Sequence, residues 1–171
     1  MTKKPETVLF ELQLKINEGL SKGTSQSKMQ ELINFLAGEV KKRTRLGYGV
    51  DSPGANRKGL KALSPNYIKK RRLDKKRGRL HPDTTPSKSN LTRTGQMLNS
   101  LQGKAQSGRK GIINLKASRN DGKTNPEIAG YNEEKGRKFM NLSNLELKRA
   151  RQLVRENLIV EVKKSISELI N

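Results

Sequence analysis

The chain has 171 residues, with 37 Lys or Arg against 16 Asp or Glu, a formal charge of +21, one His and no Cys. The lack of Cys excludes disulfides, thiolate metal sites and a cysteine nucleophile, and no apolar run approaches the ~20 residues that cross a bilayer. The first residues lack the uninterrupted apolar core of a secretory signal, so we expect neither export nor membrane contact. The length suits a single domain over residues 1–171, and the charge predicts a polyanionic partner.

The positive charge is concentrated in the middle of the sequence. Residues 1–40 are electrically neutral, residues 41–110 carry a net charge of +17, and residues 111–171 carry +4. Leu, Ile, Val and Phe make up 23 % of the chain, just above the ~20 % below which highly charged sequences are typically disordered. We therefore expect a small core with long solvated or partner-dependent segments.

The N-terminal quarter predicts a strand and then a helix. Apolar and polar residues alternate strictly over residues 10–17, which favours a strand, although a helical stripe also fits. Ser27 and Gln30 form a candidate capping box for the helix, the run of Lys41 to Arg43 suits the negative end of its dipole, and Gly47 is the expected stop. The apolar residues of this helix share one face: Met29, Leu32, Ile33, Leu36 and Val40.

The basic middle of the chain predicts mainly loops. Residues 47–59 contain four Gly and one Pro, which is typical of a loop. Ser64 and Pro65 predict the N-cap and first turn of a short helix that reaches Ile68. We expect residues 69–90 to form an extended basic loop, with residues 69–79 as either loop or a frayed helix end, because repulsion between their charges disfavours a compact structure.

The segments that follow predict a short helix and a hairpin. Residues 94–101 suit a short helix capped by Thr92 or Thr94, with its apolar side chains on one face. Residues 111–118 and 126–131 are expected to be strands joined through the turn signal Asp121-Gly122.

The strongest pattern lies at the C-terminal end. Ser143 and Glu146 form a capping box, followed by a helical stripe of Leu147, Ala150, Val154, Leu158, Val162, Ile166 and Ile170. These elements together predict an α+β fold: a small antiparallel sheet with packed helices, a long C-terminal helix and extended basic loops.

Nothing in the sequence has the pattern of an active site. His81 lies in a basic loop beside Pro82 and Asp83, and one imidazole without neighbouring ligands makes no zinc site. The acidic residues are scattered, without the paired carboxylates of a two-metal nuclease, and Glu133 and Glu134 are interpreted as part of a surface ion-pair cluster. We therefore expect no catalytic residues, no metal and no cofactor, with a metal-dependent nuclease as the remaining enzymatic alternative.

The basic run is the candidate contact with a polyanion. Each Lys or Arg that neutralises a phosphate releases counterions and adds sequence-independent affinity. Few aromatic residues are available for base stacking, and no zinc-finger or RNA-recognition pattern is present, so we expect contact with a backbone rather than with bases. The expected contact residues are Lys69, Lys70, Arg71, Arg72, Lys75, Lys76, Arg77 and Arg79.

Five short segments follow one another in a recognisable order. They are RTRLGYGV at 43–50, LSPNYIKKRR at 63–72, LTRTGQMLNSL at 91–101, IINLKAS at 112–118 and GRKFMNLS at 136–143. This order resembles the phage virion-morphogenesis or tail-completion proteins, the small neck and minor tail proteins of long-tailed bacteriophages. The chain departs from that family's pattern in having no His in residues 129–139 and Lys135-Gly136 in place of the usual Pro. The motif residues with expected structural roles are Arg45, Gly47, Tyr67, Gly95, Leu98, Leu101, Arg137, Phe139 and Ser143.

The resemblance implies a non-enzymatic structural protein of the virion neck or tail. Such a protein would form a homo-oligomeric ring that joins or completes the tail at the head–tail interface, after assembly in the host cytoplasm. Its implied partners are other neck, tail or portal-proximal proteins, with genome DNA or acidic neighbouring subunits against the basic segment and no membrane. The residues alone leave one alternative open, a non-specific nucleic-acid-binding protein.

Overall fold

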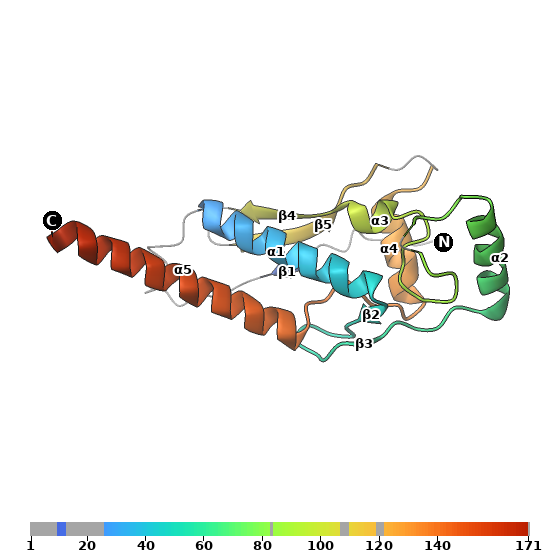
Figure 1. Ribbon diagram of the computed structural model, residues 1–171, viewed down its shortest axis with the longest axis horizontal. Helices are drawn as coiled ribbons and strands as arrows, with labels where there is room; N and C mark the ends of the chain where they lie inside the picture. The colour runs from blue at the N-terminus through green and yellow to red at the C-terminus, as the bar shows by residue number, and fades with distance from the viewer. Residues whose placement is uncertain (1–9, 13–25, 83, 107–109, 119–121, 171) are drawn as a thin grey trace, which may run out of the picture.

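The computed structural model describes residues 10–12, 26–82, 84–106, 110–118 and 122–170 of the chain. It confirms the expected α+β class: helices combine with two small antiparallel sheets, and α1 lies along one face of the larger sheet (Figure 1). In chain order the elements are β1 (Phe10–Leu12), α1 (Gln26–Arg45), β2 (Tyr48–Gly49), β3 (Lys58–Gly59), α2 (Pro65–Lys76), α3 (Gln96–Asn99), β4 (Leu101–Gln106), β5 (Lys110–Leu115), α4 (Asn125–Glu134) and α5 (Asn144–Ile170).

The main sheet has three antiparallel strands in the order β1-β5-β4, and α1 packs against the β4–β5 hairpin. Glycine makes this close packing possible. A Cβ at Gly103 would lie 2.5 Å from Cγ2 of Ile33 and 2.7 Å from its carbonyl carbon, and a Cβ at Gly111 would overlap the same side chain. Ile33 is fully buried, so the helix backbone approaches the hairpin only because both strands lack a side chain there.

The predicted capping box of Ser27 and Gln30 is wrong, because α1 already begins at Gln26. The Gln30 amide contacts the sheet instead. Its Nε2 donates to the carbonyl of Gly103 at 2.8 Å, and its Oε1 accepts from the amide of Ala105 at 2.9 Å. One side chain thus satisfies two outward-facing backbone groups at the edge of β4. At the other end of α1, Gly47 has a φ of +86° and ends the helix as predicted.

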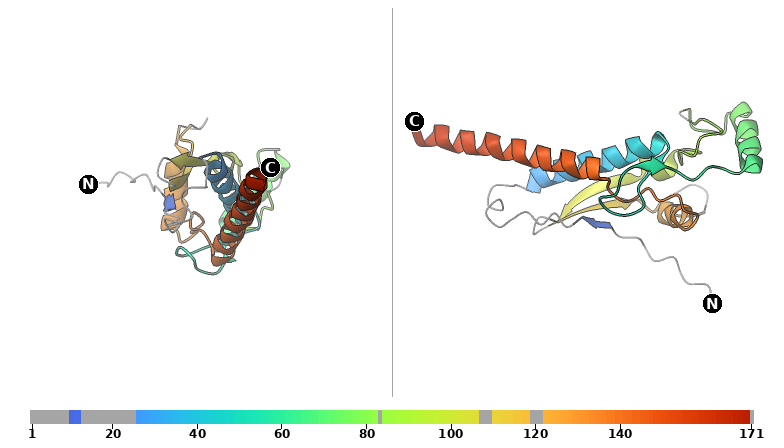
Figure 2. Two further views of the ribbon diagram at one scale, coloured as in Figure 1. Left: turned by 90° about the vertical axis from the view of Figure 1, so that its left-hand side faces the viewer. Right: turned by 90° about the horizontal axis from the view of Figure 1, so that it is seen from below.

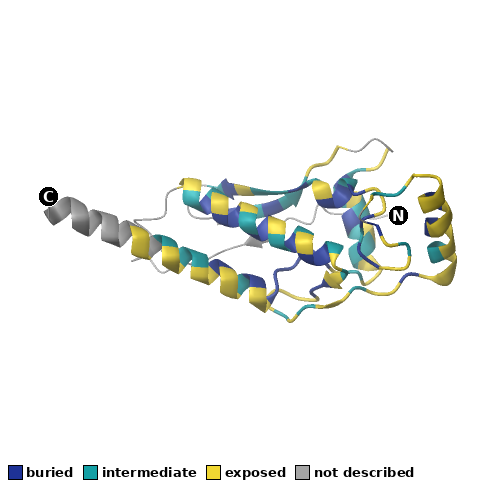
Figure 3. Ribbon diagram, in the orientation of Figure 1, coloured by how far each residue is buried: buried dark blue, intermediate teal, exposed yellow. Residues whose placement is uncertain are grey.

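The apolar core lies between α1, the sheet, the segment before α5 and the first turns of α5 (Figure 3). Phe139 is fully buried, as expected for the residue that anchors this segment. α5 runs beside α1 in the opposite direction and continues past the end of that helix, away from α2 (Figures 1 and 2). The most deeply buried apolar residues are Ile33, Leu36, Val40, Val50, Leu98, Phe139 and Ala150.

The start of α5 is fixed by a buried ionic network. The predicted capping box is confirmed: the Ser143 amide donates to the Glu146 carboxylate at 2.8 Å, and the Glu146 amide donates to Oγ of Ser143 at 3.3 Å. The same carboxylate accepts from Arg43 at 3.2 Å and from Arg57 at 3.0 Å. Arg43 also donates to the carbonyls of Phe139 and Asn141.

Arg43 therefore has a different role from the one expected for a residue in the last turn of a helix. It does not interact with the helix dipole at the surface but is 1 % exposed and joins α1 to α5 through Glu146. Burial lowers the pKa of the Arg43 guanidinium, and the negative charge of Glu146 acts in the opposite direction. The charge of Arg43 is thus stabilised mainly by a residue far away in sequence.

The second half of the expected hairpin is wrong. Residues 126–131 lie in α4, because Thr124 caps a helix there and forms a capping box with Glu127, with Pro126 in the first turn. The hairpin partner of β5 is β4, which precedes it in the chain, and β1 pairs with the other edge of β5.

Three loop and helix boundaries also differ from the prediction. Residues 47–59 are not entirely loop, since β2 and β3 pair across them, and the first part of the expected loop 69–90 is helical. The helix expected over 94–101 is shorter: α3 spans Gln96–Asn99, its N-cap is Gly95 rather than a threonine, and Leu101 begins β4. Of the strand expected over 10–17, β1 covers 10–12, and 13–17 lie outside the described residues.

Candidate functional site

The basic run is presented on helix α2, which lies at one end of the molecule, opposite the tip of α5 (Figures 1 and 2). The predicted start is confirmed: the Oγ of Ser64 accepts from the Tyr67 amide at 3.3 Å, and Pro65 occupies the first turn. The helix continues to Lys76, beyond the expected end at Ile68. The prediction of a loop from residue 69 is therefore wrong, and the reason lies in two polar residues that α2 buries.

Arg71 and Asp74, one turn apart on α2, face the segment of residues 84–93. Arg71 is 2 % exposed and donates to the Lys88 carbonyl at 2.8 Å and to Oδ1 of Asn90 at 3.3 Å. Asp74 is 6 % exposed and accepts from the Arg93 guanidinium at 2.9 Å. α2 has no buried apolar residue, so these hydrogen bonds and this ion pair hold it in place.

The segment that receives α2 has its own polar interior. The Thr84 hydroxyl donates to the Thr92 carbonyl at 2.6 Å, and the Thr92 hydroxyl donates to Oδ1 of Asn90 at 2.7 Å. Thr84, Asn90 and Thr92 are each at most 2 % exposed. Asn90 thus links the threonine pair to Arg71, and a buried hydrogen-bond network substitutes for an apolar core at this end of the molecule.

Arg71 is a correction to the predicted contact residues. Its side chain is buried, so its guanidinium faces the protein interior and not an external polyanion. The same burial lowers the pKa of Arg71. The other members of the predicted set are exposed: Lys69, Lys70, Arg72, Lys75 and Lys76 on α2, and Arg77 and Arg79 just after it. The structure therefore brings seven of the eight predicted contact residues to the surface on one helix and the turn that follows it.

The outer surface of α2 is almost purely cationic. Asp74, the one acid of the helix, is turned inward to Arg93, so no carboxylate of α2 competes for the exposed lysines and arginines. Leu73 is 54 % exposed and is the one large apolar side chain of this surface. Long, exposed cationic side chains on a fixed helix can contact successive phosphates or carboxylates, with an affinity that falls as salt rises.

The motif residues with expected structural roles occupy such positions. Leu98, Leu101, Phe139 and Ser143 are buried, and Tyr67 is half-buried with the Arg71 guanidinium 6.0 Å from its ring centroid. Gly95 has a φ of +72°, and a Cβ there would lie 2.6 Å from the His81 ring, so this turn requires glycine for two reasons. The two arginines bind polar groups: Arg45 donates to Oδ1 of Asn99 at 2.7 Å, and Arg137 to the Ala62 carbonyl at 3.5 Å.

The residues that could contribute to acid–base chemistry lie in different places. His81 is half-buried against Gly95, and its backbone amide donates to the Arg93 carbonyl at 2.9 Å. The Glu133 carboxylate accepts from the amides of Phe139 and Met140, which differs from the predicted surface ion-pair cluster. Within the described ranges, no group of three or more His, Cys, Asp or Glu side chains is placed to hold a metal ion.

Sequence reasoning missed the residues that position α2. Asn90 and Arg93 carry no recognisable pattern, since their partners on α2 are about twenty residues away. The sequence did single out Asp74, because it is the one acidic residue inside a dense basic run. Such a residue either neutralises neighbouring positive charges at the surface or faces inward and pairs with a basic residue of another segment. The structure selects the second, and the basic helix depends on it.

None of the described helices is long and apolar enough to cross a membrane. Comparison with known protein families, curated proteins and solved structures finds no match to this chain.

Proposed function

We propose that this chain is a structural virion protein of the neck or tail-completion type, which forms a ring at the head–tail interface. Its basic helix α2 contacts genome DNA or acidic neighbouring subunits. The single observation that carries this proposal is α2 itself: a cationic helix at one end of the molecule, held by buried Arg71 and Asp74 so that its other basic residues point outward.

Two further observations support an assembly role. The colinear motifs coincide with buried or conformationally restricted positions, such as Gly95 and Phe139, as expected if they encode a fold. α5 extends beyond the rest of the molecule and exposes apolar side chains, with Ile159 49 % and Val160 62 % accessible to solvent. Apolar surface on a projecting helix favours burial against a neighbouring subunit.

The first test is the composition of the particle. Mass spectrometry of purified virions should detect the protein at a fixed low copy number, and loss of its gene should leave heads and tails unjoined or tails defective. Detection in the infected-cell lysate, with none in particles, would reject the virion role.

The same helix supports the second candidate, a free non-specific nucleic-acid-binding protein. A variant with Gln at the seven exposed basic positions, with Arg71 retained to keep α2 in place, tests the binding of phosphate directly. Its plot of log affinity for duplex DNA against log salt should flatten by about 0.9 for each phosphate that α2 no longer neutralises. A control for the loss of positive charge elsewhere places Gln at three exposed basic residues of α5, namely Lys148, Arg151 and Arg155. An unchanged slope in the α2 variant means that α2 does not meet phosphate.

A further inference from the structure

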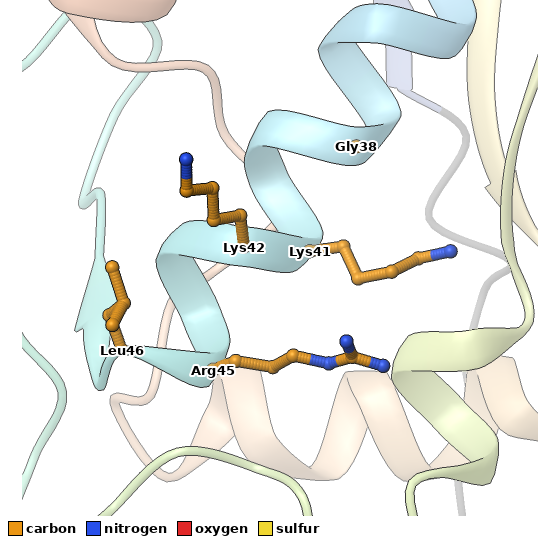
Figure 4. Close-up of a pocket in the computed structure, with 5 residues that line it drawn as sticks. All are labelled: Gly38, Lys41, Lys42, Arg45 and Leu46. Atoms are coloured by element: carbon orange, nitrogen blue, oxygen red, sulfur yellow. The ribbon is translucent and has the colours of Figure 1, made fainter. Parts of the chain in front are cut away.

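A second cationic site lies away from α2, on the C-terminal half of α1. A pocket of about 370 Å³ opens there, lined by Gly38, Lys41, Lys42, Arg45 and Leu46 (Figure 4). The spacing of three, four and seven residues from Gly38 places Lys41, Lys42 and Arg45 on one face of α1, and Leu46 follows the last residue of the helix. Among the described residues, no acidic side chain lines the pocket.

Gly38 is the unusual residue of this face. A glycine inside a helix costs about 1 kcal/mol relative to alanine, so it needs a reason. In strand β4, Gly103 is required because a Cβ there would overlap Ile33. A Cβ at Gly38 would meet no atom within 4 Å, so packing does not require glycine at this position of α1. Its backbone conformation does not require glycine either, because its φ is not positive. What the missing side chain provides is an open floor beneath the basic side chains.

Of the three basic side chains around this floor, Arg45 has a hydrogen-bond partner, and the two lysines have no counterion among the described residues. Lys41 and Arg45 extend in the same direction, toward α3, and Arg45 is fixed by its hydrogen bond of 2.7 Å to Asn99 (Figure 4). The pKa of Lys41 is lowered, mainly by burial and to a smaller extent by the positive charge of Arg45. Within the described part of the chain, neither Lys41 nor Lys42 forms an ion pair. An anion in the pocket would offset both the burial and the repulsion.

We propose that this pocket binds an acidic side chain of a protein partner, and that Leu46 contacts an apolar residue beside it. Leu46 lines the pocket and is 50 % exposed, so apolar surface borders the cations. The sugar–phosphate backbone of a duplex offers no match for that surface, whereas a peptide of alternating acidic and apolar residues matches both parts. The site goes beyond the proposed function, because it is separate from α2 and does not depend on a place in a virion.

The experiment uses fluorescence anisotropy with a labelled peptide of alternating Glu and Leu. Gly38→Leu fills the pocket and keeps every charge, and Lys41→Gln removes one cation. Lys41→Gln should weaken peptide binding about tenfold, the value of one charge-assisted hydrogen bond, Gly38→Leu should weaken it by at least as much because it blocks the pocket, and both should leave duplex DNA affinity unchanged. The charge-matched control, Lys148→Gln on α5, should bind like the wild type, and circular dichroism should show that all variants are folded.

Three outcomes would overturn the inference. Peptide binding unaffected by Gly38→Leu would mean that the pocket is not the site. Equal binding of a Gln–Leu peptide would mean that the cations do not recognise charge. Loss of duplex binding on filling the pocket would make it a nucleic-acid contact instead. The α2 variant with Gln at its exposed basic positions separates the two proposals, because it should lose DNA binding and keep peptide binding.

Discussion

Replacing Glu146 with Gln tests whether the buried ionic network holds α5 on the body of the protein. The Glu146 carboxylate is fully buried and accepts from the Ser143 amide, from Arg43 and from Arg57. Gln has nearly the same shape but no charge, and its NH₂ group would face hydrogen-bond donors. Arg57 still has Glu39 at 3.6 Å, whereas Arg43 has no other carboxylate as a bonded partner among the described residues.

The magnitude follows from the burial of Arg43. Removing one partner of a buried pair leaves an uncompensated charge and costs about 3–5 kcal/mol, because the low-dielectric interior does not replace the missing counterion. Two carbonyl acceptors, on Phe139 and Asn141, remain bonded to the guanidinium, which places the expected destabilisation toward the lower end. For a chain of this length the melting temperature should fall by roughly 6–20 °C.

Urea unfolding followed by circular dichroism measures the destabilisation. The control is Arg149→Gln, which breaks the exposed pair of Arg149 and Glu39 and should cost less than about 1 kcal/mol. In a double-mutant cycle, Arg43→Met combined with Glu146→Gln should cost less than the sum of the single variants. A destabilisation below about 1 kcal/mol for Glu146→Gln, or a coupling energy of zero, would refute this role of the network.

Two further predictions follow from close packing and from capping. Gly103→Ala should destabilise the protein by about 1–3 kcal/mol, because its Cβ would meet the backbone of Ile33, while Gly59→Ala, in open space, should be neutral or slightly stabilising in the same unfolding assay. Thr124→Ala should cost about 1 kcal/mol through loss of the α4 N-cap. Hydrogen bonds from Thr124 lower the pKa of Glu127, so this cap stabilises the fold above the ordinary glutamate pKa and is lost as pH falls through the lowered value. Thr124→Ala keeps the larger, backbone contribution and removes the side-chain hydrogen bond, so it should weaken part of the pH dependence of the unfolding free energy in that range, and an unchanged profile would contradict the side-chain contribution.

Local sequence signals identify several elements correctly. Ser64 with Pro65 and Ser143 with Glu146 mark the starts of α2 and α5, because a capping side chain bonds to backbone groups three residues away. The stripe of α1 marks its buried face for the same reason, since helical periodicity is local.

Two local patterns mislead. The segment of residues 126–131, after the turn signal Asp121-Gly122, favours a strand, but the capping box of Thr124 and Glu127 at its start is the better guide to α4. β4, the hairpin partner of β5, has too many polar residues for its sequence to predict a strand. The outward-facing backbone groups of Gly103 and Ala105 on β4 bond to Gln30 of α1, a contact that the sequence of β4 does not reveal.

The candidate surface shows the same division. The residue pattern alone establishes that the chain is strongly basic, that the charge gathers near residues 69–79 and that caps begin the helices there and at α5. The inward direction of Arg71, the pairing of Asp74 with Arg93 and the place of Arg43 in the core emerge only in three dimensions. The difference lies in the range of the interactions: a cap is completed within one helical turn, whereas a charge can be buried only where a distant segment supplies its counterion or its hydrogen bonds.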